Sequence, residues 1–164
     1  MPARPPLAAR DKITIDVNTL AIFLVEDHPG NRFVAPELEQ GLQGRFIPLT
    51  PDIVPIRAYW IMTRQWGCDR VDSEKAIRHF LDHYPTVQYC PITKDVIHMA
   101  FELARELHHD VFDTTYLAVA LQNQATGIMT TDTDFRNLCQ KKRLQYVNPV
   151  PPRVLDKFAG WKTA

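Results

Sequence analysis

The sequence has little of several features that define common protein classes. Its 164 residues include three cysteines, Cys68, Cys90 and Cys139, which are odd in number, widely spaced and without a Cys-x-x-Cys motif. This pattern argues against a disulfide framework or a zinc site and predicts reduced, mostly buried thiols. The longest apolar candidate, 20–25, is far shorter than the ~18 residues of a membrane-spanning helix, so no membrane span is expected.

Motifs of several enzyme classes are also absent. The phosphate-binding loops G-x-x-x-x-G-K-[ST] and G-x-G-x-x-G do not occur, which leaves a kinase or a dehydrogenase without support. The single serine, Ser73, lies between two acids at an expected helix start, which argues against a serine-nucleophile hydrolase. Because 19 Lys and Arg balance 19 Asp and Glu, a nucleic-acid partner would need a local basic rim.

The composition itself is that of an ordinary globular protein. Hydrophobic residues make up 45% and charged residues 23%, which predicts one packed core rather than a disordered chain. We expect a flexible arm over 1–11, one domain over 12–148 and an extension with a short helix over 149–164. The first ten residues contain no apolar segment typical of a signal peptide, so a cytoplasmic location is the expectation.

Hydrophobic patterns alternate between two types along the chain. Short β-branched and apolar runs predict strands at 13–17, 46–48, 86–90, 128–131 and 144–147. Longer periodic segments predict helices at 18–27, about 34–42, 51–66, about 72–83, 93–108, 112–125 and 134–142, with a short last one ending at Gly160. This order predicts a three-layer α/β/α fold, with a parallel sheet of four to five strands and helices on both faces.

Three acids are placed where such a fold binds ligands. Asp16 ends the first strand and Asp132 follows the fourth, and the carboxyl ends of parallel strands meet at one edge of the sheet. Asp113 opens the helix that leads back to that edge. Three adjacent carboxylates repel one another unless a cation compensates them, and oxygen ligands suit Mg²⁺ or Mn²⁺. Each acid alone could instead be structural, since Asp113 and Asp134 could be helix N-caps and Asp16 a turn residue.

The segments around these acids resemble a known family. Ile-Asp-Val-Asn at 15–18, Phe-Asp-Thr-Thr-Tyr-Leu-Ala-Val-Ala at 112–120 and Thr-Thr-Asp-Thr-Asp-Phe at 130–135 resemble PIN domains, especially the VapC-type toxin nucleases. The resemblance covers about 12–148 and implies a PIN fold. It matches the family's acids to Asp16, Asp113 and Asp132, with Asp134 as a fourth possible metal ligand and Asn18 and Thr131 in support.

The resemblance also implies an activity and partners. It implies an endoribonuclease that uses Mg²⁺ or Mn²⁺ to hydrolyse RNA phosphodiester bonds, with Asp16, Asp113 and Asp132 as catalytic residues. It further implies the toxin of a type II toxin–antitoxin pair, which forms a homodimer and is silenced by a small antitoxin protein. The alternative is a catalytically degenerate PIN module that binds RNA or a protein partner without cleavage.

One position departs from the family pattern. Arg57 stands where VapC-like chains usually carry a glutamate, and an arginine cannot ligate a metal ion. Either the aspartates suffice, or another acid replaces the glutamate, or activity is weakened. The candidate replacements are Asp52, Glu37 and Glu39. Arg57 itself could contact an RNA phosphate, pair with Asp16 or Asp132, or be a solvated surface residue.

The remaining signals each have a plain structural interpretation. Lys141, Lys142 and Arg143, with Arg136 before them, form a basic patch that is either an RNA-binding rim or a solvated helix end. The histidines at 79, 83, 108 and 109 are expected to lie on the surface rather than to bind a metal. The aromatic residues at 59, 60 and 66 are expected to pack in the core or in an interface.

Overall fold

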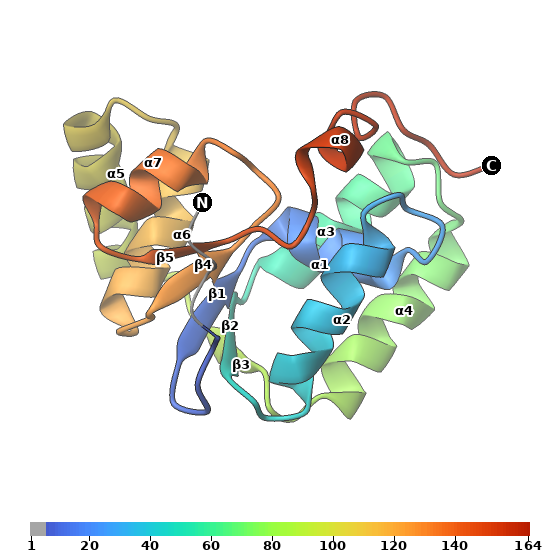
Figure 1. Ribbon diagram of the computed structural model, residues 1–164, viewed down its shortest axis with the longest axis horizontal. Coiled ribbons are helices and arrows are strands. Elements are labelled where there is room, and N and C mark those ends of the chain that lie inside the picture. The colour runs from blue at the N-terminus through green and yellow to red at the C-terminus, as the bar shows by residue number, and fades with distance from the viewer. Residues whose placement is uncertain (1–5) are drawn as a thin grey trace.

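The computed structural model describes residues 6–164 and contains one sheet of five parallel strands, in the order β3-β2-β1-β4-β5 (Figure 1). Residues 1–5 of the expected arm lie outside the described part. The strands are β1 (Lys12–Ile15), β2 (Ile47–Pro51), β3 (Gln88–Cys90), β4 (Gly127–Met129) and β5 (Gln145–Val147). The predicted parallel sheet is therefore confirmed. Its strand order reverses between β1 and β4, the place where open parallel sheets bind ligands.

Helices cover both faces of this sheet. One face carries α1 (Val17–Leu24), α2 (Asn31–Leu42), α3 (Val54–Trp60) and α4 (Arg70–His83), and the other α5 (Lys94–Leu107), α6 (Val111–Gln122) and α7 (Phe135–Lys141) (Figure 1). A short α8 (Pro152–Leu155) follows β5. Crossovers between parallel strands are right-handed, so connections toward β3 use one face and connections toward β5 use the other.

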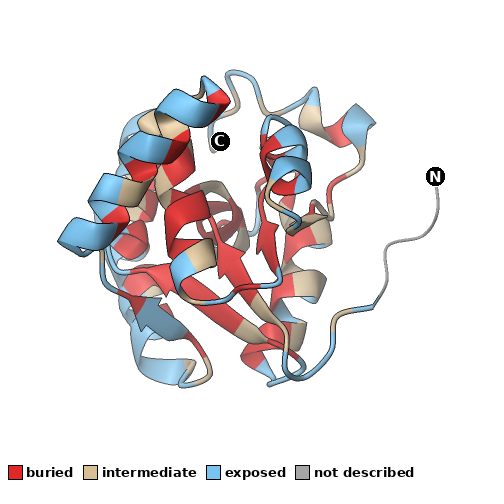
Figure 2. Cartoon of the chain, turned by 90° about the vertical axis from the view of Figure 1, so that its left-hand side faces the viewer, coloured by how far each residue is buried: buried red, intermediate tan, exposed pale blue. Residues whose placement is uncertain are grey.

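The central strand and α6 form the most buried part of the core. Ile13, Thr14 and Ile15 of β1 are at most 1% exposed, because helices cover both sides of the strand (Figure 2). On α6, which packs on β1 and β4, Leu117 to Ala120 are fully buried. A helix that is apolar on all sides is typical of a core position. Asp16, which directly follows β1, and Asp113, in the first turn of α6, are therefore attached to the most buried elements of the fold.

The segment 46–67 differs from the sequence prediction. The predicted strand at 46–48 is β2, which continues to Pro51, and the predicted helix over 51–66 is α3 followed by a π-helical turn, η1 (Ile61–Gln65). Proline is disfavoured inside central strands, which is why the strand was predicted to stop at Pro48. Gly67 ends the segment as expected, with a φ of 74° that glycine adopts without strain.

Two helix starts also differ from the prediction. The start of α4 is capped by Asp69, whose carboxylate accepts hydrogen bonds from the N–H groups of Val71 (2.8 Å) and Asp72 (3.0 Å), and not by the segment around Ser73. The start of α6 is capped by Asp110, not by Asp113. The first helix begins two residues and the second one residue earlier than predicted, because an aspartate just upstream is the better cap.

The C-terminal extension packs against the domain. Val150 and Val154 form a small apolar cluster with Ile22 of α1 and Val34 of α2. The last helix is shorter than expected, since α8 ends at Leu155 rather than near Gly160. The three cysteines are free, two of them buried, as predicted. Within 6–164, no helix is both long and apolar enough to cross a bilayer.

Candidate functional site

Asp16 is a buried carboxylate at the centre of the sheet edge. It directly follows β1 and caps α1, where its Oδ1 accepts a hydrogen bond from the Thr19 N–H (2.7 Å). Its Oδ2 accepts one from the Thr130 hydroxyl (2.6 Å). Burial raises the pKa of Asp16 to about 6; the hydrogen bonds from Thr130 and Thr19 oppose that rise and the charge of Asp132 adds to it. The fold thus holds this carboxylate in place although its charge is costly there.

Asp132 lies beside Asp16, just beyond β4. Its N–H donates to the Thr130 hydroxyl (3.0 Å), so this one threonine connects both acids. Its Oδ1 accepts from the Asp134 N–H (2.9 Å), and its backbone carbonyl accepts from the Tyr146 hydroxyl (3.2 Å). Asp134 is exposed, at the N-terminal end of α7, and its carboxylate makes no capping hydrogen bond there. Asp134 therefore occupies the N-cap position of α7, as the structural interpretation expected, but its side chain does not cap the helix.

The threonine that supports the acids is not the predicted one. Thr131 was expected to assist, but its contact is a backbone one, since its carbonyl accepts a long hydrogen bond from the Asn148 amide (3.4 Å). The hydroxyl that joins the acids belongs to Thr130, which is fully buried. Successive residues at a strand end point in opposite directions, and the sequence Thr-Thr-Asp does not show which threonine faces the site.

Asp113 joins the same electrostatic cluster from α6. Its side chain is half-buried, and its Oδ2 lies 3.3 Å from Nδ1 of His109, an ion-pair distance. Burial raises the pKa of Asp113 to about 6, the charge of Asp132 raises it further, His109 opposes the shift, and Asp110 and Asp134 add to it. Sequence analysis assigned His109 to the surface and so missed this contact. The i, i+4 spacing of the two residues was the available signal.

Tyr116 is a second residue that the sequence analysis did not single out. Its hydroxyl is buried next to the backbone of Val17. Burial raises its pKa, the negative charges of Asp16 and Asp113 also raise it, and the positive charge of Arg57 opposes them. The hydroxyl is therefore within electrostatic reach of two of the three acids and of Arg57. It is three residues after Asp113, on the same face of α6.

Arg57 does not pair with the acids. Within residues 6–164 its guanidinium forms no ion pair, and it lies 5.0 Å from the ring centroid of Phe112. Together with Phe112 and Tyr116 it lines a cavity of about 240 Å³. The interpretation that Arg57 replaces a cation by pairing with Asp16 or Asp132 is therefore wrong. Its guanidinium, which forms no ion pair within the described residues, is available to contact an anion such as an RNA phosphate.

The candidate replacements for the missing glutamate lie elsewhere. Glu37 and Glu39 are on α2, which starts at the far end of α1, where the Asn31 amide donates to the Ile22 carbonyl (3.0 Å). Asp52 is exposed and follows β2. None of the three is among the charges that most affect Asp16 or Asp113. Asn18 is half-buried on the first turn of α1, next to Asp16 in the chain.

The acids fit a hard divalent cation in donor chemistry. In the part of the chain that the structure describes, no three His, Cys, Asp or Glu side chains lie close enough together to hold a metal ion between them. Mg²⁺, however, is usually held by one or two carboxylates and completes its shell with water. The charged donors of the site are carboxylates; burial raises the pKa values of Asp16 and Asp113, and the negative charge of Asp132 adds to both shifts. A bound cation would offset these charges.

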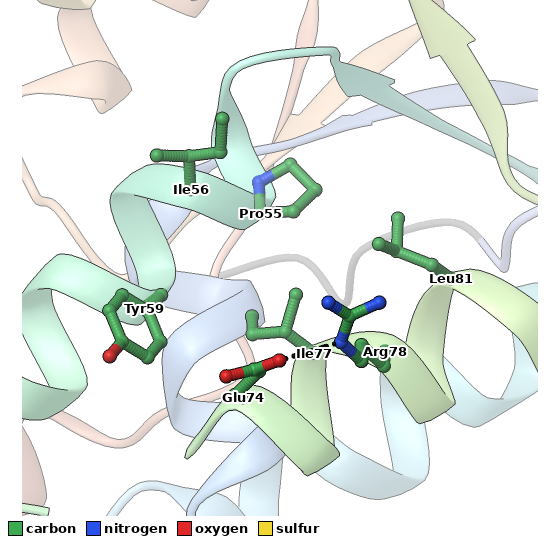
Figure 3. A pocket seen from close by; sticks show the side chains of 7 residues that line it. All are labelled: Pro55, Ile56, Tyr59, Glu74, Ile77, Arg78 and Leu81. Carbon is green, nitrogen blue, oxygen red and sulfur yellow. Dashed lines mark hydrogen bonds and ion pairs between the residues drawn. The ribbon is translucent and has the colours of Figure 1, made fainter. Parts of the chain in front are cut away.

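Other hollows lack this chemistry. The groove between α3 and α4, of about 560 Å³, is lined mainly by apolar side chains such as Ile56, Ile77 and Leu81 (Figure 3). Its one carboxylate, Glu74, forms an ion pair with Arg78 at 2.8 Å, drawn as a dashed line in Figure 3. This groove is suited to contact with an apolar surface and not to catalysis of hydrolysis.

The fold and the acid cluster together define a class: an α/β/α protein with carboxylates converging where the strand order reverses. The chain belongs to the PIN domain family, whose model matches residues 13–141. The resemblance seen in the sequence is therefore confirmed at the level of the family.

Solved structures of VapC toxins share the fold. The VapC20 toxin of Mycobacterium tuberculosis, described as cleaving the sarcin–ricin loop, has a TM-score of 0.63 and 18% identity over 77% of this chain and 94% of its own. VapBC2 from Rickettsia felis, bound to a promoter DNA fragment, gives 0.62 and 14% over 84% and 98%. A toxin–antitoxin complex from Klebsiella pneumoniae gives 0.60 and 20% over 84% and 98%. At such identities the likeness shows the fold alone.

Among curated proteins, a match of another kind occurs. The ATP-binding subunit ClpC of the Clp protease from Staphylococcus aureus is 36% identical over 57 residues. That alignment spans 35% of this chain but only 7% of the relative's own length. It therefore says nothing about the activity of the whole chain.

Proposed function

We propose that this chain is an endoribonuclease that depends on Mg²⁺ or Mn²⁺ and hydrolyses RNA phosphodiester bonds. Membership of the PIN domain family supports a ribonuclease in general. The observation that carries the metal dependence is the convergence of Asp16, Asp113 and Asp132 at the edge where the strand order reverses, with Asp16 and Asp113 partly or fully buried and the charge of Asp132 acting on both. Three uncompensated carboxylates in one partly buried place are costly unless a cation binds there.

Each residue of the cluster then has a role. Asp16, Asp113 and Asp132 would hold the ion, directly or through water, with Asp134 assisting. A divalent ion in such a place lowers the pKa of a bound water and neutralises the phosphate under attack. The Thr130 hydroxyl donates to the Asp16 carboxylate and accepts from the Asp132 N–H, so this threonine holds the two acids at a fixed distance from each other. His109, in the turn before α6, lies 3.3 Å from the Asp113 carboxylate and, when protonated, would offset part of its charge.

The test is cleavage of RNA by the purified chain with Mn²⁺ or Mg²⁺. Even outer partners of metal ligands typically contribute 10–100-fold, so Asp16→Asn and Asp132→Asn should each lower the rate by at least about 100-fold. The matched control is Asp82→Asn, an exposed acid on α4. Cleavage that persists in both site variants, or that needs no divalent ion, would contradict the proposal.

The second candidate function is a PIN module that binds RNA or a protein without cleaving. The observation that favours it is Arg57 at the position of the family's usual glutamate, with Asp52, Glu37 and Glu39 all outside the acid cluster. It predicts RNA binding that is retained in Asp132→Asn and no cleavage by the wild-type chain with either metal. The cleavage assay above therefore separates the two functions.

The role as the toxin of a type II toxin–antitoxin pair is part of the same proposal. It is supported by the structural likeness to the VapC20 toxin, to VapBC2 and to the toxin–antitoxin complex from Klebsiella pneumoniae. Exposed apolar side chains on α3 and α4, Ile56 at 66% and Leu81 at 43%, border the groove of Figure 3 and offer area to a small antitoxin. Exposed Ile97 and Phe101 on α5 offer area to a homodimer contact.

Co-expression with the neighbouring small gene, followed by a growth assay, tests the toxin role.

A further inference from the structure

Two pairs of an arginine and an aromatic ring flank the acid cluster. On one side, Arg57 of α3 lies 5.0 Å from the ring centroid of Phe112, the residue just before Asp113. This pair is called the α3/α6 platform. On the other side, Arg136 of α7 lies 5.6 Å from the ring centroid of Tyr146 on β5, whose hydroxyl donates to the backbone carbonyl of Asp132. This pair is called the α7/β5 platform.

The ring of the α3/α6 platform is open, that of the α7/β5 platform is partly exposed, and neither arginine is compensated by a carboxylate. Phe112 is 61% exposed, far more than a large aromatic ring on a helix needs to be. Arg136 is exposed and Arg57 half-exposed, and within 6–164 neither guanidinium forms an ion pair with a carboxylate. The α3/α6 platform borders the cavity of about 240 Å³ next to Tyr116. The α7/β5 platform borders a hollow of about 780 Å³ that also includes Thr133 and Asn148.

The sheet places the platforms on opposite sides of the acids. In the order β3-β2-β1-β4-β5, Arg57 follows β2, Asp16 follows β1, and Tyr146 lies on β5. Neighbouring strands are about 4.8 Å apart, so the carboxyl ends of β2 and β5 are separated by roughly 14 Å. A chain of nucleotides laid across this edge would meet a platform, then the acids, then the other platform.

We infer that the two platforms contact the nucleotides on either side of the phosphate at the acid cluster, each arginine a backbone phosphate and each ring an unpaired base. An arginine provides a charge for a backbone phosphate, and an exposed ring provides a face on which an unpaired base stacks. In a paired A-form helix the base faces are not accessible, and the major groove is too narrow for side chains to read. This inference rests on the proposed function, because it takes RNA as the ligand of the same site.

The charge distribution supports this path over the one expected from sequence. Of the basic patch predicted near Asp132, Lys142 forms an ion pair with Glu106 of α5 (2.8 Å). Lys141 and Arg143 stand just before β5, whose first residue pairs with Gly127, the first residue of β4. They are therefore at the amino edge of the sheet, away from the acids. Only Arg136, at the start of α7, remains on the carboxyl edge.

A binding experiment separates the inference from catalysis. The probe is a short fluorescently labelled single-stranded RNA, compared with the same RNA annealed to its complement, and the protein carries Asp132→Asn so that no cleavage occurs. We expect tighter binding of the single strand. Phe112→Leu and Tyr146→Leu should each weaken it by about 5-fold to 100-fold, the range of one base stack. Tyr146→Phe, which keeps the ring but loses the hydroxyl, should bind like the parent.

The arginines have their own readout. Replacing Arg57 or Arg136 by Gln should lower the slope of log affinity against log salt by about 0.7 each, the value for one phosphate contact on a single strand. The matched control is a third pair, Arg32 over Phe33 at 4.8 Å, located on α2. It is separated from Asp16 by the length of α1, eight residues or about 12 Å. Phe33→Leu and Arg32→Gln should leave affinity and salt slope unchanged.

The outcomes distinguish this inference from the proposed function. Equal binding of single and paired RNA, or full affinity in both leucine variants, overturns the platforms even if the wild-type chain cleaves RNA. Platform-dependent binding by a wild-type chain that never cleaves supports the platforms and overturns the nuclease. A leucine variant that changes the sedimentation of the protein and not its RNA affinity assigns that ring to a protein interface and also overturns the inference.

Discussion

The two ends of α1 each carry a buried ionisable side chain, and their surroundings are opposite. Asp16, before the helix, and His28, after it, are both 3% exposed. Asp16 is held by hydrogen bonds from Thr19 and Thr130 and faces other acids, and burial raises its pKa to about 6. His28 is enclosed by rings, and burial lowers its pKa to about 4. The surroundings of Asp16 hold a carboxyl whose charge is costly beside other acids, and the surroundings of His28 favour the neutral ring.

The environment of His28 shows what a structural role looks like. Its ring centroid lies 4.5 Å from that of Trp66 and 4.6 Å from those of Phe158 and Trp161, which belong to the C-terminal extension. Its Nδ1 accepts a hydrogen bond from the Gly30 N–H (3.0 Å). No second ionisable group is needed to satisfy the ring. Burial of an ionisable side chain therefore does not by itself identify a functional site; Asp16 differs from His28 in that further acids converge on it.

The largest expected effect tests the His28 end. Because the folded state lowers the pKa of His28 from 6.5 to about 4, the stability it allows is complete above pH 6.5 and is lost as the pH falls toward 4, by up to about 3 kcal/mol. Urea unfolding at several pH values measures this slope. His28→Phe should flatten it, whereas His98→Gln, at an exposed position on α5, should not. An equally steep slope in His28→Phe would show that the ring is not the titrating group.

The next effect concerns the acid end and depends on metal. Mn²⁺ at 100 times its dissociation constant should stabilise the wild-type chain by about 2.7 kcal/mol, because a ligand of the folded state alone shifts unfolding by mass action. The midpoint of thermal unfolding with and without Mn²⁺ measures this. Asp16→Asn should lose most of the shift, and His28→Phe should keep it, since the aromatic cluster holds no part of the acid site. A shift of the same size in Asp16→Asn would place the ion elsewhere.

Without metal, removal of the Asp16 charge should stabilise the protein. A carboxyl whose pKa rises on folding costs stability once the pH exceeds its unfolded value, and the full cost is present above the folded value of about 6. Asp16→Asn should therefore increase the free energy of unfolding by about 2 kcal/mol at pH 8 in EDTA, and by much less at pH 4. This is opposite in sign to the His28 effect over the same pH range. A variant less stable at pH 8 would mean that the hydrogen bonds from Thr19 and Thr130 outweigh the charge.

The sequence predicted the acids well because strand order constrains them. Asp16 and Asp132 follow two apolar runs, and a parallel sheet brings the ends of such runs to one edge whatever the loops do. It did not predict the partners of the acids, because these depend on side-chain direction within one or two residues. Thr130 rather than Thr131 reaches Asp16, and His109 at a helix end turns toward Asp113. The choice between the two threonines leaves no signal in the sequence, and the i, i+4 spacing of His109 and Asp113 is a weak one because His109 lies outside the helix.

The basic residues show a second limit of sequence analysis. Lys141 and Arg143 are near Asp132 in the chain but at the opposite edge of the sheet, because α7 leads from the end of β4 back toward the start of β5. Arg57 is far from Asp132 in the chain and close to the site in space. Proximity in sequence predicts contact within one helical turn, and beyond that the topology decides.

The smallest expected effect separates capping from function on α6. Asp110 caps the helix through the Phe112 N–H (2.7 Å), so Asp110→Ala should lower the free energy of unfolding by about 1 kcal/mol and leave cleavage nearly unchanged. Asp113→Asn should do the reverse, with no loss of stability and a large loss of cleavage, because Asp113 makes no capping hydrogen bond and its charge is repelled by Asp132. Chemical unfolding and the cleavage assay, run on both variants, measure the two quantities. If Asp113→Asn lost stability and kept cleavage, the acid on α6 would be structural like His28, and the metal site would rest on Asp16 and Asp132 alone.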